Sequence, residues 1–348
     1  MSETLQQLGL VPFFTQQLAL LGVPESRLAR VVSVQRSHST VAGEAGRCTV
    51  ELSLALQQSA AIDRPTVGDW VVLDATLSRI EQVLERKSLF KRMAAGREAQ
   101  MQPIAANIDV LFLLSSCNEE FKESRLERYL ALCLEAGAMP VIVLTKADLA
   151  EDAQGYVQRA RRVRAGVPVE MVDARDPATL DGVRAWIDAS TTAALVGSSG
   201  VGKSTLLNAL AGSSVAATGG IREQDKKGRH TTTHRELHPL PGGGLLIDVP
   251  GMRELRVADV EQSLEEVFDD VEKLARHCQF QNCQHLAEPG CAVKQAIEEN
   301  RLDARRLANY QKLCRENALA TESLAQKHAR ERDFGKMVKA VKRLKSRE

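Results

Sequence analysis

The stretch GSSGVGKST (197–205) decides how this chain folds. The apolar residues AALV (193–196) before it predict a strand, and TLLNALAG (205–212) after it has helical spacing. A glycine-rich loop between a strand and a helix N-terminus encloses phosphate oxygens with backbone amides, and the helix end adds partial positive charge. The alternative, a simple glycine-rich turn with a surface lysine, explains neither the spacing of the loop residues nor the strand and helix patterns on its two sides. The stretch therefore predicts a phosphate-binding loop.

The residue types within this loop assign its chemistry. Lys203 is placed to reach the outer phosphates of a nucleoside triphosphate, and Ser204 is the expected Mg²⁺ ligand, so we take both as catalytic candidates. The predicted nucleotide contacts of the loop are Gly197, Ser198, Ser199, Gly200, Val201, Gly202, Lys203, Ser204 and Thr205.

The segment TKAD (145–148), which follows the apolar run VIVL (141–144), indicates the base. An aspartate at this place accepts two hydrogen bonds from the guanine edge, and adenine offers no such pair of donors. Taken alone, the segment is explained equally well without any nucleotide, as the end of a strand followed by a helix cap at Asp148. Together with the phosphate loop it favours guanine recognition, with Thr145 and Lys146 as further nucleotide contacts.

A third motif, IDVPG (247–251), ends another apolar strand. Its spacing matches a magnesium-sensing aspartate, Asp248, and a glycine that contacts the γ-phosphate, Gly251. The preceding loop GRHTTT (228–233) offers threonines for a second magnesium contact. Thr232 is our candidate, and the sequence does not distinguish it from its neighbours Thr231 and Thr233.

The order of these motifs is unusual for a small GTPase. There, the phosphate loop comes first and the base-reading motif late, whereas here TKAD and a segment MVDA (171–174) precede the phosphate loop. Joining the original ends of a domain and cutting it elsewhere is sterically feasible, because domain termini often lie close together. We therefore interpret this region as a circularly permuted GTPase domain.

Composition limits the classes of protein that the chain can belong to. It has 348 residues, 44% of them hydrophobic, and a formal net charge of +1, so two or three domains with real cores are expected and nucleic acid binding is not indicated by overall charge. No apolar stretch of membrane-spanning length and no secretory leader is visible, which predicts a cytoplasmic protein without membrane contact. The seven cysteines are then not a disulfide framework.

Three patterns follow one another along the chain. Short β-rich runs from about residue 28 to 84 predict a small closed barrel with Trp70 in its core. Alternating strands and helices from about 108 to 252 predict a mainly parallel sheet with helices on both faces, and a helical pattern follows. The expected fold is α/β, divided into an N-terminal extension (1–27), a closed barrel (28–85), a basic linker (86–105), a circularly permuted P-loop GTPase domain (106–258) and a helical zinc-binding domain with a basic tail (259–348).

The loop CQFQNCQHLAEPGC (278–291) gathers metal-binding residue types. Cys278, Cys283, His285 and Cys291 suit a closed tetrahedral Zn²⁺ site, with bonds of about 2.3 Å to sulfur and about 2.0 to 2.1 Å to nitrogen. Four protein ligands leave no position for a catalytic water, so the site is expected to be structural. His277 is then a neighbour, since thiolates bind zinc more strongly; the alternative is a loop of reduced thiols without metal.

The combination of motifs resembles a known family. A barrel containing VGDW, the sequences TKAD, GSSGVGKST, GRHTTT and DVPGMRE, and the C-x4-C-x-H-x5-C loop are similar to the ribosome small-subunit-dependent GTPase A family, also called RsgA or YjeQ. The resemblance spans about residues 28 to 315. It implies an OB-fold for the barrel at 28–85. It also implies an enzyme that hydrolyses GTP to GDP and phosphate while bound to the 30S ribosomal subunit and its rRNA, late in subunit maturation. Thr145 replaces the commoner asparagine, and we expect this to loosen packing against the phosphate loop.

The sequence lacks the residue that usually positions the attacking water for GTP hydrolysis. Many GTPases carry a glutamine after DxxG, but Met252 follows Gly251 here, and a thioether cannot orient water. Intrinsic hydrolysis is therefore expected to be slow, with the water positioned either by His230 or by a group from the partner.

The sequence gives weaker support for an RNA partner than the family resemblance does. Basic residues gather between barrel and GTPase domain and in the C-terminal tail, yet such runs are usually solvated surfaces. The basic residues before the GTPase domain are Arg86, Lys87, Lys91, Arg92 and Arg97. Two alternatives to a partner-stimulated, monomeric GTPase stay open: an ATP-using P-loop enzyme, and an RNA-binding zinc and OB module that holds nucleotide as a structural ligand.

Overall fold

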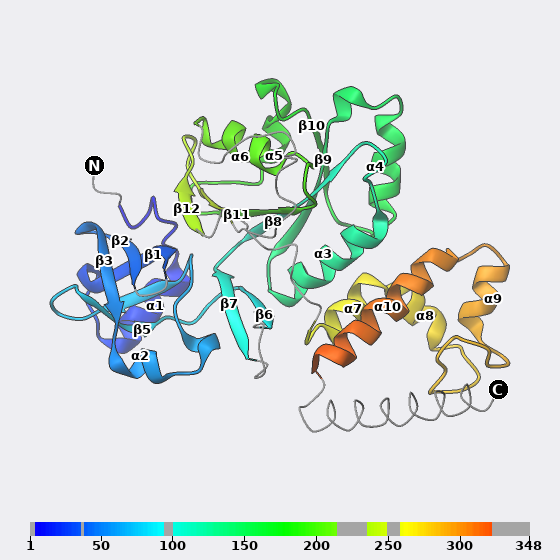
Figure 1. Cartoon of the computed structure of the whole chain (residues 1–348), viewed down its shortest axis with the longest axis horizontal. Coiled ribbons are helices and arrows are strands. Elements are labelled where there is room, and N and C mark those ends of the chain that lie inside the picture. The colour runs from blue at the N-terminus through cyan, green and yellow to red at the C-terminus, as the bar shows by residue number, and fades with distance from the viewer. Residues whose placement is uncertain (1–3, 36–37, 94–99, 214–234, 249–257, 322–348) are drawn as a thin grey trace, which may run out of the picture.

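The computed structural model describes residues 4–35, 38–93, 100–213, 235–248 and 258–321. A barrel, a central α/β domain and a helical C-terminal region follow one another along the molecule (Figure 1). The predicted α/β fold class with an N-terminal barrel and a C-terminal helical region is confirmed. Among the described helices, none combines the length and apolar character that crossing a membrane requires.

The N-terminal extension packs against the barrel. Helix α1 (Pro12–Leu21) starts with a proline and ends at Gly22, whose φ of +64° favours glycine. Phe14 and Leu18 of this helix are buried, and the Phe14 ring lies 5.7 Å from that of Trp70. Trp70 is fully buried, which confirms its predicted place in the core.

Five strands close the barrel. They are β1 (Leu28–Val34), β2 (Ser39–Gly43), β3 (Gly46–Leu52), β4 (Trp70–Leu73) and β5 (Arg79–Val83). They run in the order β1-β2-β3-β5-β4, and pairing of β4 with β1 completes the circle. Alternate residues such as Val31, Val41 and Ile80 fill the interior, as expected for strands with one buried face. Helix α2 (Leu54–Gln58) and two short 3₁₀ helices (Glu25–Arg27 and Ala61–Asp63) complete this region.

The segment expected to be a basic linker contains a β-hairpin instead. Strands β6 (Leu89–Met93) and β7 (Met101–Ala106) pair in antiparallel fashion. Phe90 and Ile104 are buried, so apolar residues between the basic ones give the segment a packed face that the charge pattern concealed. Its contacts include a bridge from Ala105 to Val67 of the barrel region.

The central domain is built on a largely parallel sheet. Its strands are β8 (Val110–Ser116), β9 (Met139–Thr145), β10 (Val169–Val172), β11 (Thr192–Gly197), β12 (Glu236–Pro239) and β13 (Leu245–Asp248), in the order β10-β9-β8-β11-β13-β12. Only β12 is antiparallel to its neighbour among these described strands. Because β12 also pairs with β1, where Glu236 lies opposite Ser33, the sheet continues into the barrel.

Helices cover both faces of this sheet. They are α3 (Glu123–Glu135), α4 (Ala153–Arg161), α5 (Asp181–Arg184) and α6 (Lys203–Ala211), with 3₁₀ helices at Ala147–Leu149 and Pro177–Thr179. Alternate residues of β8 pack into two hydrophobic clusters, one on each face of the sheet. Leu111 and Leu113 join the cluster with α3 and α4, whereas Phe112 and Leu114 join the cluster with α5 and α6. A strand buried on both faces reads as a continuous apolar run, and VLFLL (110–114) is such a run.

A buried ion cluster fastens the C-terminal helices to α3. These helices are α7 (Glu261–Val267), α8 (Asp269–Ala275), α9 (Ala292–Glu298) and α10 (Ala304–Thr321). The Glu127 carboxylate of α3 is completely buried and accepts hydrogen bonds from Arg305, Arg306 and Asn309 of α10. Arg306 also pairs with Asp270 of α8. Removing Glu127 would leave Arg305 and Arg306 without their buried shared acceptor, so the contact fixes how α10 packs on α3.

A second buried charge, Arg30 of β1, joins the barrel to the central domain. Its guanidinium donates to the carbonyl oxygens of Leu8, Gly68 and Asn107 and to the hydroxyl of Thr192. Burial lowers the pKa of Arg30 to about 10, opposed by the charges of the nearby Asp109 and Asp69, so the side chain stays protonated at neutral pH.

Replacing Arg30 should therefore destabilise the whole fold. Arg30→Met keeps the length of the side chain but removes four hydrogen bonds, two of them to the carbonyl groups of Leu8 and Asn107, and we expect a loss of at least about 3 kcal/mol. Arg27→Met is the matched control, because Arg27 is more exposed and its pair with Glu81 should contribute no more than about 1 kcal/mol. Urea unfolding followed by circular dichroism measures both variants. Equal shifts of the unfolding midpoint would contradict the role given to Arg30.

Candidate functional site

The phosphate-loop sequence forms the turn between β11 and α6. Gly197 ends the strand, and Gly200 and Gly202 have φ values of +73° and +95°, which side chains other than glycine rarely adopt. The Lys203 ammonium donates to the carbonyl oxygens of Gly197 and Ser198, at 2.8 and 2.6 Å. The loop therefore curves around a positive charge at a helix N-terminus, which is the arrangement that binds phosphate.

The carboxyl ends of five parallel strands meet beside this loop. Strands β8, β9 and β10 extend to one side in chain order, and β11 and β13 lie on the other side of β8. Such a reversal of strand order creates a crevice at the carboxyl edge, where open α/β sheets bind their ligands. The sheet thus brings the loop after β11 next to the ends of β9, β10 and β13.

The TKAD segment touches the phosphate loop directly. Thr145 is buried at the end of β9, and its hydroxyl donates to the carbonyl of Val201 at 2.6 Å. Lys146 follows with φ of +57°, and Asp148 lies in the 3₁₀ helix after it. We expected Thr145 to loosen the packing here, but its hydrogen bond ties the two loops together because the β-branched hydroxyl reaches the neighbouring backbone.

Asp248 stands at the end of β13. Burial raises the pKa of its carboxyl group, and the positive charges of His238 and Lys203 oppose this rise. Strands β11 and β13 are adjacent and parallel, so Asp248 and the loop that carries Lys203 lie at the same edge of the sheet. A cation bound between them and a phosphate would favour the charged carboxylate.

Several predicted site residues lie outside the described residues. These are His230, Thr232 and Gly251, together with Met252 and the two alternative threonines, Thr231 and Thr233. Their proposed roles stay predictions from the sequence.

Arg175 is a site residue that the sequence analysis missed. It follows β10, and its guanidinium donates to Asp148 at 2.5 Å and to Asp173 at 3.2 Å. The available signal was the MVDA segment, because a strand parallel to β9 must deliver the residues after it to the same edge of the sheet.

Part of the basic segment is engaged within the chain. Arg86 forms an ion pair with the buried Asp69, Lys87 pairs with Asp109, and Lys91 lies 3.4 Å from Glu135. Burial raises the pKa of Asp69, and the hydrogen bonds and charge of Arg86 oppose that rise. These three side chains therefore hold the barrel and hairpin in place, which reduces the charge available to RNA. Arg97 lies outside the described residues.

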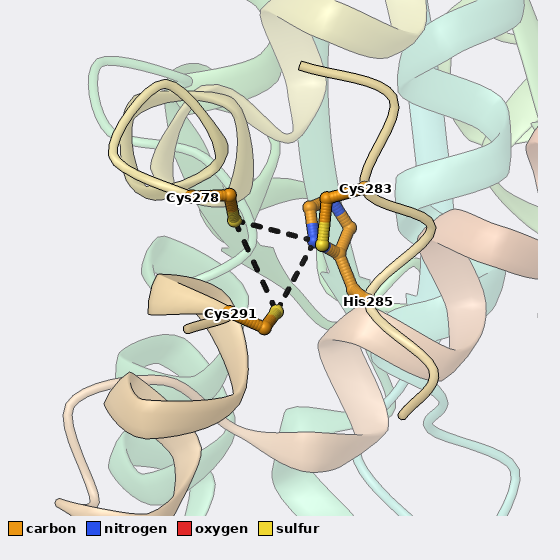
Figure 2. Close-up of side chains that lie close together, drawn as sticks. All are labelled: Cys278, Cys283, His285 and Cys291. Carbon is orange, nitrogen blue, oxygen red and sulfur yellow. Dashed lines mark hydrogen bonds between the residues drawn. The ribbon is translucent and has the colours of Figure 1, made fainter. Parts of the chain in front are cut away.

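The cysteine-rich loop between α8 and α9 brings its four predicted ligands together (Figure 2). The Sγ atoms of Cys278 and Cys291 are 3.9 Å apart, and the Nδ1 atom of His285 lies 3.7 and 3.5 Å from them. A zinc tetrahedron with bonds of about 2.3 Å to sulfur and about 2.1 Å to nitrogen has edges of about 3.6 to 3.8 Å. All four ligand atoms lie within 4.8 Å of one another, so this donor set fits a tetrahedral metal.

The surroundings of this cluster favour ligation. Burial lowers the pKa of His285, opposed by Glu288 and Glu272, and the neutral imidazole is the form that binds metal. Burial acts to raise the pKa of Cys278, but hydrogen bonds from the first amides of α9 and from neighbouring thiols outweigh it and leave that pKa lowered. His277 instead lies outside the cluster, with Nδ1 2.9 Å from the carbonyl oxygen of Lys273.

Comparison with known proteins identifies the family. The model of the RsgA GTPase family matches residues 83–258. The small ribosomal subunit biogenesis GTPase RsgA 2 of Vibrio vulnificus is 46% identical over 338 residues, covering 97% of this chain and 95% of that protein. The small ribosomal subunit biogenesis GTPase RsgA of Xanthomonas oryzae is 46% identical over 311 residues, with 87% and 84% covered.

Solved structures agree with this result. The crystal structure of YjeQ from Thermotoga maritima is 27% identical, has a TM-score of 0.59, and covers 82% of this chain and 96% of its own. YloQ, described as a circularly permuted GTPase, is 22% identical with a TM-score of 0.57 and supports the fold alone. The resemblance inferred from the motifs, including the permuted order, is confirmed: this chain belongs to the RsgA GTPase family, whose members are hydrolases that act on GTP.

Proposed function

We propose that this chain binds the small (30S) ribosomal subunit and hydrolyses GTP to GDP and phosphate during late maturation of that subunit. The relatives named small ribosomal subunit biogenesis GTPases support the partner, because they match nearly the whole chain. The observation that carries the proposal is the hydrogen bond between Thr145 and Val201, which joins the base-reading loop to the phosphate loop. One nucleotide can then contact both.

The roles of the individual residues follow from their places in the crevice. Backbone amides of residues 197–205 hold the phosphates, and Lys203 neutralises the charge that grows on them during bond cleavage. Ser204 and Asp248 would hold Mg²⁺, which supplies further neutralisation of the β- and γ-phosphates. Asp148 selects guanine. Thr232, Gly251 and His230 complete the proposal from the sequence alone, as second magnesium contact, γ-phosphate contact and candidate for positioning the water.

The zinc-candidate loop has a structural role in this proposal. Three thiolates and one imidazole close the coordination shell, so Zn²⁺ would hold α8 and α9 together and leave no position for substrate. The Glu127 cluster connects α10, and through Arg306 and Asp270 also α8, to α3, which follows β8 of the nucleotide domain. A change at the nucleotide can therefore alter the orientation of a rigid C-terminal surface.

RNA contact and location complete the proposal. We place the protein in the cytoplasm as a monomer that docks on the rRNA of the 30S subunit through lysine and arginine side chains. The ion pairs of Arg86, Lys87 and Lys91 favour contacts made by other basic residues.

Turnover with purified ribosomal subunits tests the main proposal. GTP hydrolysis by the chain alone should be very slow, and 30S subunits should accelerate it, within the roughly 10³- to 10⁵-fold range that an activating partner can supply. The acceleration should weaken as salt rises, because docking to RNA phosphates releases counterions. Large subunits serve as the control. Equal rates of GTP hydrolysis with and without 30S subunits at low salt would contradict this proposal. The chain would then be a nucleotide-binding module rather than a partner-stimulated enzyme.

Thr145→Val tests the connection between the two loops. Valine keeps the shape but cannot donate to Val201, and the loss of one hydrogen bond of about 1 kcal/mol should weaken GDP binding roughly five-fold. Thr145→Ser retains the hydroxyl and is the matched control. Titration with a fluorescent GDP analogue measures both variants. Unchanged affinity in the valine variant would show that the bond does not support the bound nucleotide.

Elemental analysis and chelation test the zinc proposal. One zinc per chain is expected, and Cys283→Ser should lose it and lower the melting temperature of the C-terminal helices. Cys48→Ser, in β3 of the barrel, changes the same atom far from the cluster and should keep the metal. A protein that contains no metal and melts identically after chelation would rule out a structural site.

A further inference from the structure

The carboxylate that we assign to guanine recognition is already engaged by a side chain of the same protein. The terminal nitrogen of Arg175 donates to Oδ2 of Asp148 at 2.5 Å, and its Nε donates to Oδ1 of Asp173 at 3.2 Å. Arg175 thus bridges two aspartates at the carboxyl edge of the sheet.

The sheet register produces this arrangement. Strands β9 and β10 are parallel, with Val172 opposite Thr145, so the chain leaves both strands at the same level. The loop after β10 is fixed, because Thr179 bonds to both the amide and the carbonyl of Asp173, and the Asp173 carboxylate accepts the amide of Arg175. Arg175 is therefore presented toward Asp148 by an ordered turn.

Guanine and the Arg175 guanidinium present similar hydrogen-bond donors to the Asp148 carboxylate. Guanine offers N1–H and an exocyclic amine to a carboxylate, and a guanidinium offers N–H donors in a comparable planar fork. Asp148 has only two oxygens, and the guanine edge requires both of them. Arg175 already donates to Oδ2, so the base and the arginine compete for that oxygen.

We propose that Arg175 is an internal competitor for the guanine edge at Asp148 and so lowers the affinity of the site for GTP and GDP alike. This inference rests on the proposed assignment of Asp148 to guanine. The loss of affinity is equal for GTP and GDP because they share the base. It arises at the contact between Asp148 and guanine rather than at the phosphates.

The exposure of the pair sets the size of the effect. The side chain of Arg175 is 65% exposed and that of Asp148 is 28% exposed. Exposed ion pairs are weak, so nucleotide displaces the arginine readily, and the competition should reduce affinity by about two- to six-fold. The alternative role, in which Arg175 moves onto the bound base and helps to hold it, predicts a change of opposite sign.

Titration of fluorescent GDP and ADP into the full-length protein tests the proposal. Arg175→Ala should bind GDP about two- to six-fold more tightly than the wild type, and the gain should shrink between about 50 mM and about 500 mM salt as the ion pair is screened. Arg184→Ala is the matched control, since it removes an exposed arginine of the same domain that pairs with Asp181 instead. Loss of a positive charge near an anionic ligand ordinarily weakens binding, so a gain confined to Arg175→Ala is diagnostic.

The same substitution made in an Asp148→Asn variant separates competition at Asp148 from a general effect of Arg175→Ala on the loop. In Asp148→Asn, titrated with xanthosine diphosphate, Arg175→Ala should give a smaller gain because a neutral amide holds the guanidinium more weakly. Unchanged or weaker GDP binding by Arg175→Ala, or an equal gain in Arg184→Ala, would overturn the inference while the guanine assignment stands. A wild-type protein that does not prefer GDP over ADP would overturn the guanine assignment, and this inference with it.

Discussion

The structure depends on one buried positive charge, that of Arg30. A guanidinium removed from water requires partners for its N–H groups, and these partners come from the N-terminal extension, the turn before β4, the residue after β7 and the first residue of β11. Because β11 ends in the phosphate loop, the same strand joins the barrel contact to the nucleotide site. The barrel and the catalytic domain are therefore positioned relative to each other by a polar constraint as well as by the shared sheet.

A second polar constraint holds the other side of the catalytic domain. Glu127 of α3 receives two arginines and an asparagine from α10, and no solvent reaches it. Both constraints act at fixed points and in fixed directions, unlike apolar packing, which tolerates small shifts. Together they give the barrel and the C-terminal helices a defined orientation on the GTPase domain.

Much of the fold and the site could be predicted from contiguous sequence. The phosphate loop, TKAD, the strands around them and the four ligands of the cysteine-rich loop are local patterns, in which spacing alone restricts the chemistry. The hairpin of β6 and β7 escaped prediction because its apolar residues are interrupted by lysine and arginine. Its short strands also contact the barrel at Val67 and α3 at Glu135, and such contacts leave no local sequence pattern.

The sequence by itself determined which chemical groups are present: a phosphate-loop sequence, the TKAD motif, four residues of metal-ligand type and the permuted order that places them. Only the tertiary structure decided which groups meet. Thr145 reaches Val201, Arg175 reaches Asp148, and Arg30 and Glu127 find partners more than 100 residues away. Such contacts leave no periodicity in the chain, because they arise from strand register and helix packing, which are set by the whole core at once.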